Sequence, residues 1–188
     1  MIRRMQYLFL ILIMLIPLAG CQSNKITEFS FRNGVTWKST VSEVVLAEGD
    51  DNEKLNSEGW LNYYDASVSN YVADDLAYLF KEDTLTAIRY RFRSLTEENT
   101  ENLSESLAEK YGKPIDHNEE YTMKLMNLVG LDNTMFMSDE WYWDYSNWKL
   151  SDSTFIAVWE DKMYGYQILY FNGEVLDKLI TASNTSGL

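Results

Sequence analysis

The clearest pattern in the chain is a strict alternation of apolar residues and arginines near its middle. In order, these residues are Ile88, Arg89, Tyr90, Arg91, Phe92 and Arg93. Successive side chains of a strand point to opposite faces, so residues 85–93 are predicted to form a strand with one buried and one solvent-exposed face. Residues 60–66 and 71–80 precede it as strand-like segments, and the short connections predict an antiparallel meander. The expected core face of the second segment consists of Val72, Leu76, Tyr78 and Phe80.

A short helix is predicted ahead of these strands, over residues 41–48. Thr40 and Glu43 have the spacing of a capping box, in which each side chain accepts a hydrogen bond from the backbone N–H of the other residue. Gly49 is a natural helix stop. We therefore expect a capped helix with Val41, Val44 and Val45 on its apolar side.

A longer helix is predicted over residues 96–111. Leu103 and Leu107 lie four residues apart on one side of it, and Gly112 follows its last turn. Residues 115–139 are compatible with another helix or with an ordered excursion that covers a sheet edge.

The C-terminal part returns to strand patterns at residues 141–145, 154–159 and 164–171, and a last helical turn is expected after Asn172-Gly173. The order of elements is thus a helix, three strands, a helix, an excursion and three strands. This order predicts an α+β fold, with an antiparallel sheet in two meander halves and helices on one face. The two halves suggest a weak internal duplication.

The first 21 residues have the pattern of an export signal. Arg3 and Arg4 precede an apolar run at residues 5–15, which is too short for a bilayer core that needs about 20 apolar residues. Small residues then lead to Cys21, the single cysteine. An uncleaved anchor, or an ordinary signal with an incidental cysteine, are the alternatives.

Leu18-Ala-Gly-Cys21 resembles the lipobox of bacterial lipoproteins. The resemblance implies cleavage after residue 20, acylation of Cys21 and anchoring in the cell membrane, facing outside the cytoplasm. We therefore expect a signal peptide at 1–20, a lipidated tether at 21–28, one domain at 29–180 and a flexible tail at 181–188.

Charge and composition narrow the function further. Removing residues 1–20 removes two arginines and no acid, so the net charge falls from −13 to −15. Nucleic acid is therefore not an expected partner, and membrane attachment depends on the acyl chains. A lipidated Cys21 leaves no thiol for a disulfide, for catalysis or for a metal site.

The single histidine, His117, is expected in a solvated loop. The acidic stretch from Asp50 to Glu53 lacks the glycine and the distal Glu of a calcium-binding loop. We expect no cofactor and no metal.

Arg89, Arg91 and Arg93 form the first candidate binding site. They lie on one strand face, where neighbouring arginines are about 7 Å apart, and would together present a cationic ridge. Such a ridge suits an anion or an acidic protein. The alternative is that they pair with carboxylates of neighbouring strands, such as Asp75 or Glu82. We favour the pairing.

The second candidate is an aromatic block made of Trp141, Trp143, Tyr145 and Trp148. Exposed, it would stack sugar rings or bind a protein; buried, it would complete the core. Trp148 is out of phase with the other members and is the one expected to be exposed. With Glu140 and Asp144 as an acid pair, the block supports the alternative function, a carbohydrate-binding or glycoside-cleaving protein.

Asp74 shares the expected core face of residues 71–80. An acid in that position indicates a strand end, a bulge or a partly buried carboxyl group, and we expect a strand end or bulge.

The stretch from Phe31-Arg-Asn-Gly34 to Tyr111-Gly-Lys-Pro114, with Ala47-Glu-Gly49 within it, resembles uncharacterised lipoproteins of Gram-positive bacteria. Its helix-then-meander opening is also similar to the fold of β-lactamase inhibitor proteins and of small outer-membrane-assembly lipoproteins. The resemblance implies a fold used for protein binding, without catalysis. We expect a non-enzymatic module that binds another envelope protein or peptide through a sheet face or edge.

Overall fold

The computed structural model describes most of the predicted domain. The described residues are 29–49, 54–68, 70–115, 142–150, 154–161 and 165–175, together with Lys178 and Thr181. The predictions for residues 1–28 including Cys21, the acidic loop at 50–53, His117, residues 116–139 and the tail beyond Thr181 lie outside them.

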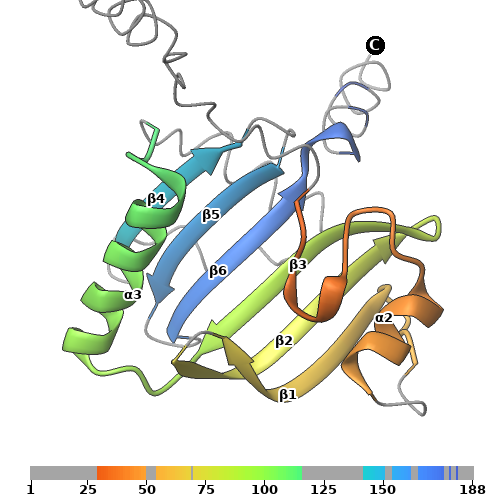
Figure 1. The fold of residues 1–188 in the computed structure, drawn as a ribbon, viewed down its shortest axis with the longest axis horizontal. Helices are drawn as coiled ribbons and strands as arrows, with labels where there is room; N and C mark the ends of the chain where they lie inside the picture. The colour runs from red at the N-terminus through yellow and green to blue at the C-terminus, as the bar shows by residue number, and fades with distance from the viewer. Residues whose placement is uncertain are drawn as a thin grey trace, which may run out of the picture.

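A six-stranded antiparallel sheet forms the centre of the protein (Figure 1). The first meander consists of β1 (Trp60–Val68), β2 (Tyr71–Lys81) and β3 (Thr84–Phe92), and the second of β4 (Tyr142–Lys149), β5 (Thr154–Asp161) and β6 (Gly165–Asn172). The strand order β1-β2-β3-β6-β5-β4 joins the halves through antiparallel pairing of β3 with β6. The prediction of an α+β fold with two meander halves is confirmed.

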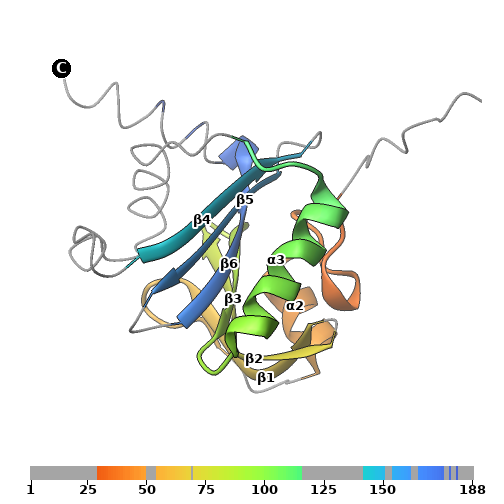
Figure 2. The ribbon, with the colours of Figure 1, turned by 90° about the vertical axis from the view of Figure 1, so that its left-hand side faces the viewer.

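The 3₁₀ turn η1 (Arg32–Gly34) and the helices α2 (Val41–Glu48) and α3 (Glu97–Tyr111) lie over one face of this sheet (Figure 2). α2 precedes the first meander and α3 precedes the second, so each half has the same order of elements. In the described part of the chain, no helix has both the length and the apolar character needed to cross a membrane.

Helix α2 begins at the predicted capping box. The Glu43 carboxylate accepts from the Thr40 N–H at 2.8 Å, and the Thr40 hydroxyl accepts from the Glu43 N–H at 3.3 Å. The first of these hydrogen bonds lowers the pKa of Glu43, because it favours the ionised carboxylate. Gly49 ends the helix with a left-handed backbone (φ 80°).

The core between the helices and the sheet is rich in aromatic residues. Phe29 and Phe31, from the segment that enters the domain, pack on Tyr170 of β6 with ring centroids 5.6 and 5.4 Å apart. Tyr111 at the end of α3 also contacts Tyr170, at 6.4 Å. Leu103 of α3 is buried in the same cluster. The entering segment thus packs on β6 and on the end of α3.

The expected core face of β2 is wrong at its first residue. Val72 is 58% exposed, whereas Ala73 is buried and belongs to the core on the helix side. The alternation shifts by one residue between Ala73 and Leu76, where two consecutive acids, Asp74 and Asp75, occur. β1 is irregular at the same level, because Asp65 has a left-handed backbone (φ 54°). Asp74 therefore lies at a strand irregularity, as expected.

The face of the sheet opposite the helices, the arginine face, is less exposed than predicted. Ile88, Tyr90 and Phe92 belong to the core on the helix side, so Arg89 and Arg91 point to the other face. Residues on the strands beside them are nevertheless fully buried: Leu79, Leu169 and Phe171. The prediction of one solvent-exposed face along this strand is therefore wrong, because apolar side chains line both faces of the sheet.

Candidate functional site

The predicted arginine ridge is an ion-paired cluster centred on Asp75. In β2, Asp75 lies directly opposite Arg91 of β3. Its Oδ1 accepts a hydrogen bond from Arg89 at 2.9 Å, and its Oδ2 accepts one from Arg91 at 3.0 Å. The side chains of Arg89 and Arg91 are only 14% and 13% exposed, and that of Asp75 is 5% exposed. The expected pairing with a carboxylate of a neighbouring strand is confirmed at Asp75.

Arg89 is held further by an aromatic ring. Its guanidinium carbon lies 5.1 Å from the ring centroid of Trp60 on β1, which gives a cation–π contact. Burial lowers the pKa of Arg91, while the neighbouring Asp75 carboxylate opposes this shift. One carboxylate thus partners two guanidinium groups, which locks β2 to β3.

Arg93 differs from the other two arginines because its side chain is exposed. Its backbone N–H donates to Asp74 Oδ2 at 2.7 Å, which fixes the chain just beyond β3. Glu82, the other expected partner, lies in the turn between β2 and β3. The three arginines are therefore not presented together as a solvent-exposed ridge, and their role in binding stays a prediction.

The expectation that Trp148 is exposed is wrong. Trp148 is 3% exposed, and its indole N–H donates to the Gly112 carbonyl at 2.8 Å. Its ring packs on Tyr111 with the centroids 6.4 Å apart. β4 continues to Lys149, and Trp148 lies opposite Ile156 of β5, which is part of the core on the helix side, so the indole points to that side.

The remaining members of the aromatic block lie outside what the structure describes. This holds for Glu140 and Trp141 and for the side chains of Trp143, Asp144 and Tyr145. The carbohydrate-binding alternative therefore lacks an exposed aromatic surface among the described residues. Trp148, the one member of the block whose side chain is described, is buried in the core.

The two edge strands of the sheet differ in how far they are closed. At β4, Ile115 forms an isolated antiparallel bridge with Asn147, and its N–H donates to the Asn147 carbonyl at 2.8 Å. At β1, the Asn56 backbone N–H donates to the Trp60 carbonyl at 2.9 Å, and Arg32 donates to the Ser67 carbonyl at 3.3 Å. Among the described residues, no strand or bridge pairs with the outer edge of β1.

Apolar side chains are exposed beside this open edge. Tyr64 of β1 is 73% exposed and Val72 of β2 is 58% exposed. Tyr64 pairs with Asp75 and Val72 pairs with Ser67, so both lie on the two strands nearest the edge. We call β1 with Tyr64 and Val72 the open edge.

Sequence reasoning missed a buried charge cluster on the helix side. The Glu48 side chain is 2% exposed, forms an ion pair with Arg32 at 3.1 Å and accepts a hydrogen bond from the Tyr78 hydroxyl at 2.5 Å. Burial raises the pKa of Tyr78, and Glu48 adds to the rise. The sequence contains a signal for this cluster, because Glu48 lies in the last turn of α2, where an acid opposes the helix dipole and is stabilised by a cationic partner. The cluster ties η1, α2 and β2 together.

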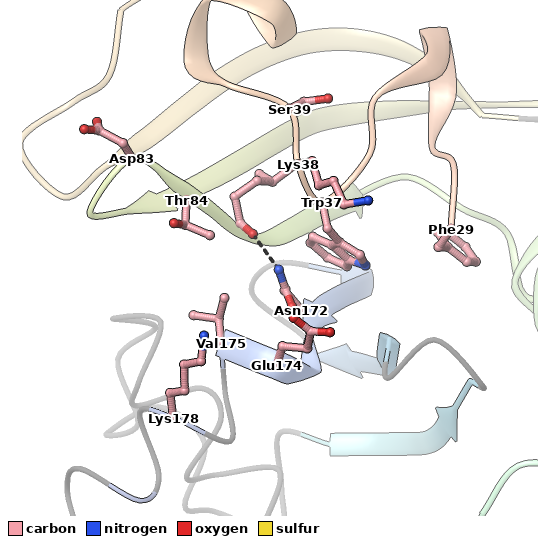
Figure 3. A pocket seen from close by; sticks show the side chains of 11 residues that line it. Phe29, Trp37, Lys38, Ser39, Asp83, Thr84, Asn172, Glu174, Val175 and Lys178 are labelled. Carbon is pink, nitrogen blue, oxygen red and sulfur yellow. Dashed lines mark hydrogen bonds between the residues drawn. The ribbon is translucent and has the colours of Figure 1, made fainter. Parts of the chain in front are cut away.

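A pocket of about 470 Å³ lies at one end of the sheet (Figure 3). The turn between β2 and β3 borders it, as do the end of β6 and the segment around Trp37. Trp37 donates its indole N–H to Thr154 Oγ1 at 2.8 Å, and Asn172 donates its amide N–H to the Leu85 carbonyl at 3.2 Å. Sequence reasoning did not predict the pocket, because its lining comes from three distant parts of the chain.

In the described ranges, no group of three or more His, Cys, Asp or Glu side chains is placed to hold a metal ion.

No protein-family model matches the chain, and neither the curated proteins nor the solved structures with which it was compared give a match. The likeness to Gram-positive lipoproteins and to the inhibitor fold therefore stays a prediction.

Proposed function

We propose that this protein is a lipid-anchored, extracytoplasmic and non-enzymatic binding module. In this proposal, acylated Cys21 holds the domain at the outer surface of the cell membrane. The open edge then binds an extended segment of another envelope protein by adding it to the sheet as a strand. The cationic-ridge form of this function is set aside, because Asp75 already neutralises part of the arginine charge.

The observation that carries the proposal is that, among the described residues, no strand or bridge pairs with the outer edge of β1. β1 is a nine-residue edge strand, and its sequence contains no Lys or Pro. Native proteins usually protect such edges with Lys, Pro, a bulge or a covering segment, because an unpaired strand pairs with other chains. In β1 the irregularity at Asp65 is the one such device seen in the described residues. The opposite edge has such cover at Asn147. An edge strand with which no described segment pairs, beside exposed Tyr64 and Val72, suits a binding partner.

Charge favours a basic partner over a second copy of this chain. The only charged residue of β1 is Asp65, and it is exposed. The full chain has 29 acidic against 16 basic residues. Two such chains repel each other, whereas an extended segment rich in Lys or Arg gains from the same field.

Site-specific crosslinking in living cells tests the proposal. Tyr64 and, separately, Leu46 are replaced by the photoreactive residue p-benzoylphenylalanine; Leu46 on α2 is the matched control, since it is 74% exposed against 73% for Tyr64. We expect an adduct from position 64 and none from position 46. Mass spectrometry should map the partner's crosslinked site to an extended, basic segment.

The anchor forms the second arm of the same experiment. Cys21→Ser should abolish palmitate labelling, release the protein from membranes and reduce the adduct at position 64. Equal adducts at positions 46 and 64, or no adduct at either, would contradict strand addition at β1. A Cys21→Ser variant that stays membrane-bound would contradict the anchor.

A further inference from the structure

The turn that borders the pocket holds an unusual backbone. Lys81 pairs with Thr84, so Glu82 and Asp83 alone connect β2 to β3. Both have positive φ, at 48° and 61°. Two-residue hairpin turns of this kind favour Asn, Asp or Gly, so Glu82 is the strained residue of the two. Backbone strain is concentrated at functional sites, and this turn borders the pocket.

The aromatic wall of the pocket is already fixed in place. The hydrogen bond from the Trp37 indole to Thr154 sets the ring orientation, and Phe31 packs on the indole edge-on with centroids 4.8 Å apart. The bond from Asn172 to Leu85 orients the Asn172 amide in the same way. Its carboxamide oxygen is then the atom that Asn172 offers to a ligand.

Opposite charges come from the segment that follows β6. Glu174 and Lys178 both line the pocket, and both are exposed. Figure 3 shows them on the two sides of Val175. Among the described lining residues, Asp83 and Glu174 balance Lys38 and Lys178, so the charged lining is neutral as a whole. A neutral lining with separated charges suits neither a simple anion nor a simple cation.

We propose that this pocket binds a compact zwitterion with a primary ammonium group and a carboxylate, as in an amino acid or a short peptide. The Glu174 carboxylate and the face of the Trp37 ring receive the ammonium group, by ion pairing and a cation–π contact. The Lys178 ammonium receives the carboxylate by ion pairing. The volume of about 470 Å³ lies within the usual range of small-molecule sites.

The site is independent of the proposed function. It lies at the end of β2, β3 and β6, whereas the open edge is on β1, and it does not require the lipid anchor. Either proposal can therefore fail without the other.

Binding is tested on the full-length protein in detergent micelles by NMR of the tryptophan indole groups, with the Trp37 signal assigned through Trp37→Phe. The probes are the dipeptide alanyl-alanine, its N-acetylated form and its C-terminal amide. We expect the free dipeptide to shift the Trp37 signal with a saturable Kd. Each capped form lacks one charge and should bind about tenfold more weakly or worse.

Two variants assign the roles of the charged residues. Glu174→Gln should remove the preference for the free amino terminus, and Lys178→Gln the preference for the free carboxylate. Glu109→Gln and Lys149→Gln change exposed residues of the same kinds away from the pocket and should leave Kd unchanged. The proposal is overturned if alanyl-alanine does not bind, if either capped form binds as tightly as alanyl-alanine, or if the pocket variants have the same Kd values as the controls.

Discussion

Asp75 shows how much one side chain can decide in this sheet. It is almost fully buried and accepts hydrogen bonds from two guanidinium groups on the next strand. A carboxylate between two arginines removes most of the cost of holding them on a largely buried face. The same acid explains why an arginine-rich strand contributes to the interior of an acidic protein.

We predict that Asp75→Asn destabilises the protein by about 3 kcal/mol. This is the lower end of the range for a broken buried pair, because Arg89 and Arg91 keep some solvent contact. Urea unfolding followed by circular dichroism measures the change. Asp65→Asn is the matched control on β1: Asp65 is exposed and has φ 54°, which Asn tolerates, so the effect should stay within about 0.5 kcal/mol. Equal effects of the two substitutions would refute the role of the ion pairs.

At the scale of elements, local sequence signals set the helix boundaries. Thr40 and Glu43 form both hydrogen bonds of the predicted capping box, and Gly49 ends α2. Such signals involve residues three or four apart, so they operate before any tertiary contact exists. α2 has only eight residues, and isolated helices of that length are marginal in water, so its cap matters to its stability.

Thr40→Ala should therefore cost about 1 kcal/mol in the free energy of unfolding, because the Glu43 N–H loses its acceptor. Ser42→Ala, at an exposed position inside the same helix, should be neutral or slightly stabilising. Thermal denaturation of both variants beside the unchanged protein gives the comparison. A Thr40→Ala variant as stable as Ser42→Ala would mean that packing alone holds α2.

At the scale of the whole molecule, buried tyrosines link the two halves and respond to pH. Burial raises the pKa of Tyr78, Tyr90 and Tyr170 above the ordinary value of 10.0. In the unfolded chain these hydroxyls ionise near pH 10, whereas the folded protein keeps them protonated. Their contribution is therefore complete below about pH 10 and is lost as the pH rises further.

The free energy of unfolding should fall above about pH 10 by up to about 1.4 kcal/mol per pH unit for each of these tyrosines. Tyr170→Phe removes one titrating group and should make the decline shallower, whatever its effect on stability at neutral pH. Tyr64→Phe, at an exposed position, should leave the slope unchanged. Urea titrations between pH 8 and 11 measure it, and a flat profile would contradict the assignment.

The sequence by itself determined most of the elements in the described part and the ends of its helices, whereas β4 reaches Lys149, beyond the predicted 141–145. Alternation predicted the three strands of the first meander, and capping and stop signals predicted α2 and α3, because these patterns depend on neighbouring residues. The pairing of Asp75 with the arginines followed from the same alternation. The lipidated Cys21 rests on sequence alone and stays a prediction.

Only the tertiary structure decided that β3 pairs with β6, so that the two meanders form one sheet. It also decided that Trp148 is buried, that Arg32 and Glu48 meet, and that no described segment pairs with the outer edge of β1. These contacts join residues far apart in the chain, and their geometry depends on how whole elements pack. A periodic pattern states which side of an element is apolar, but it does not state which neighbour covers that side.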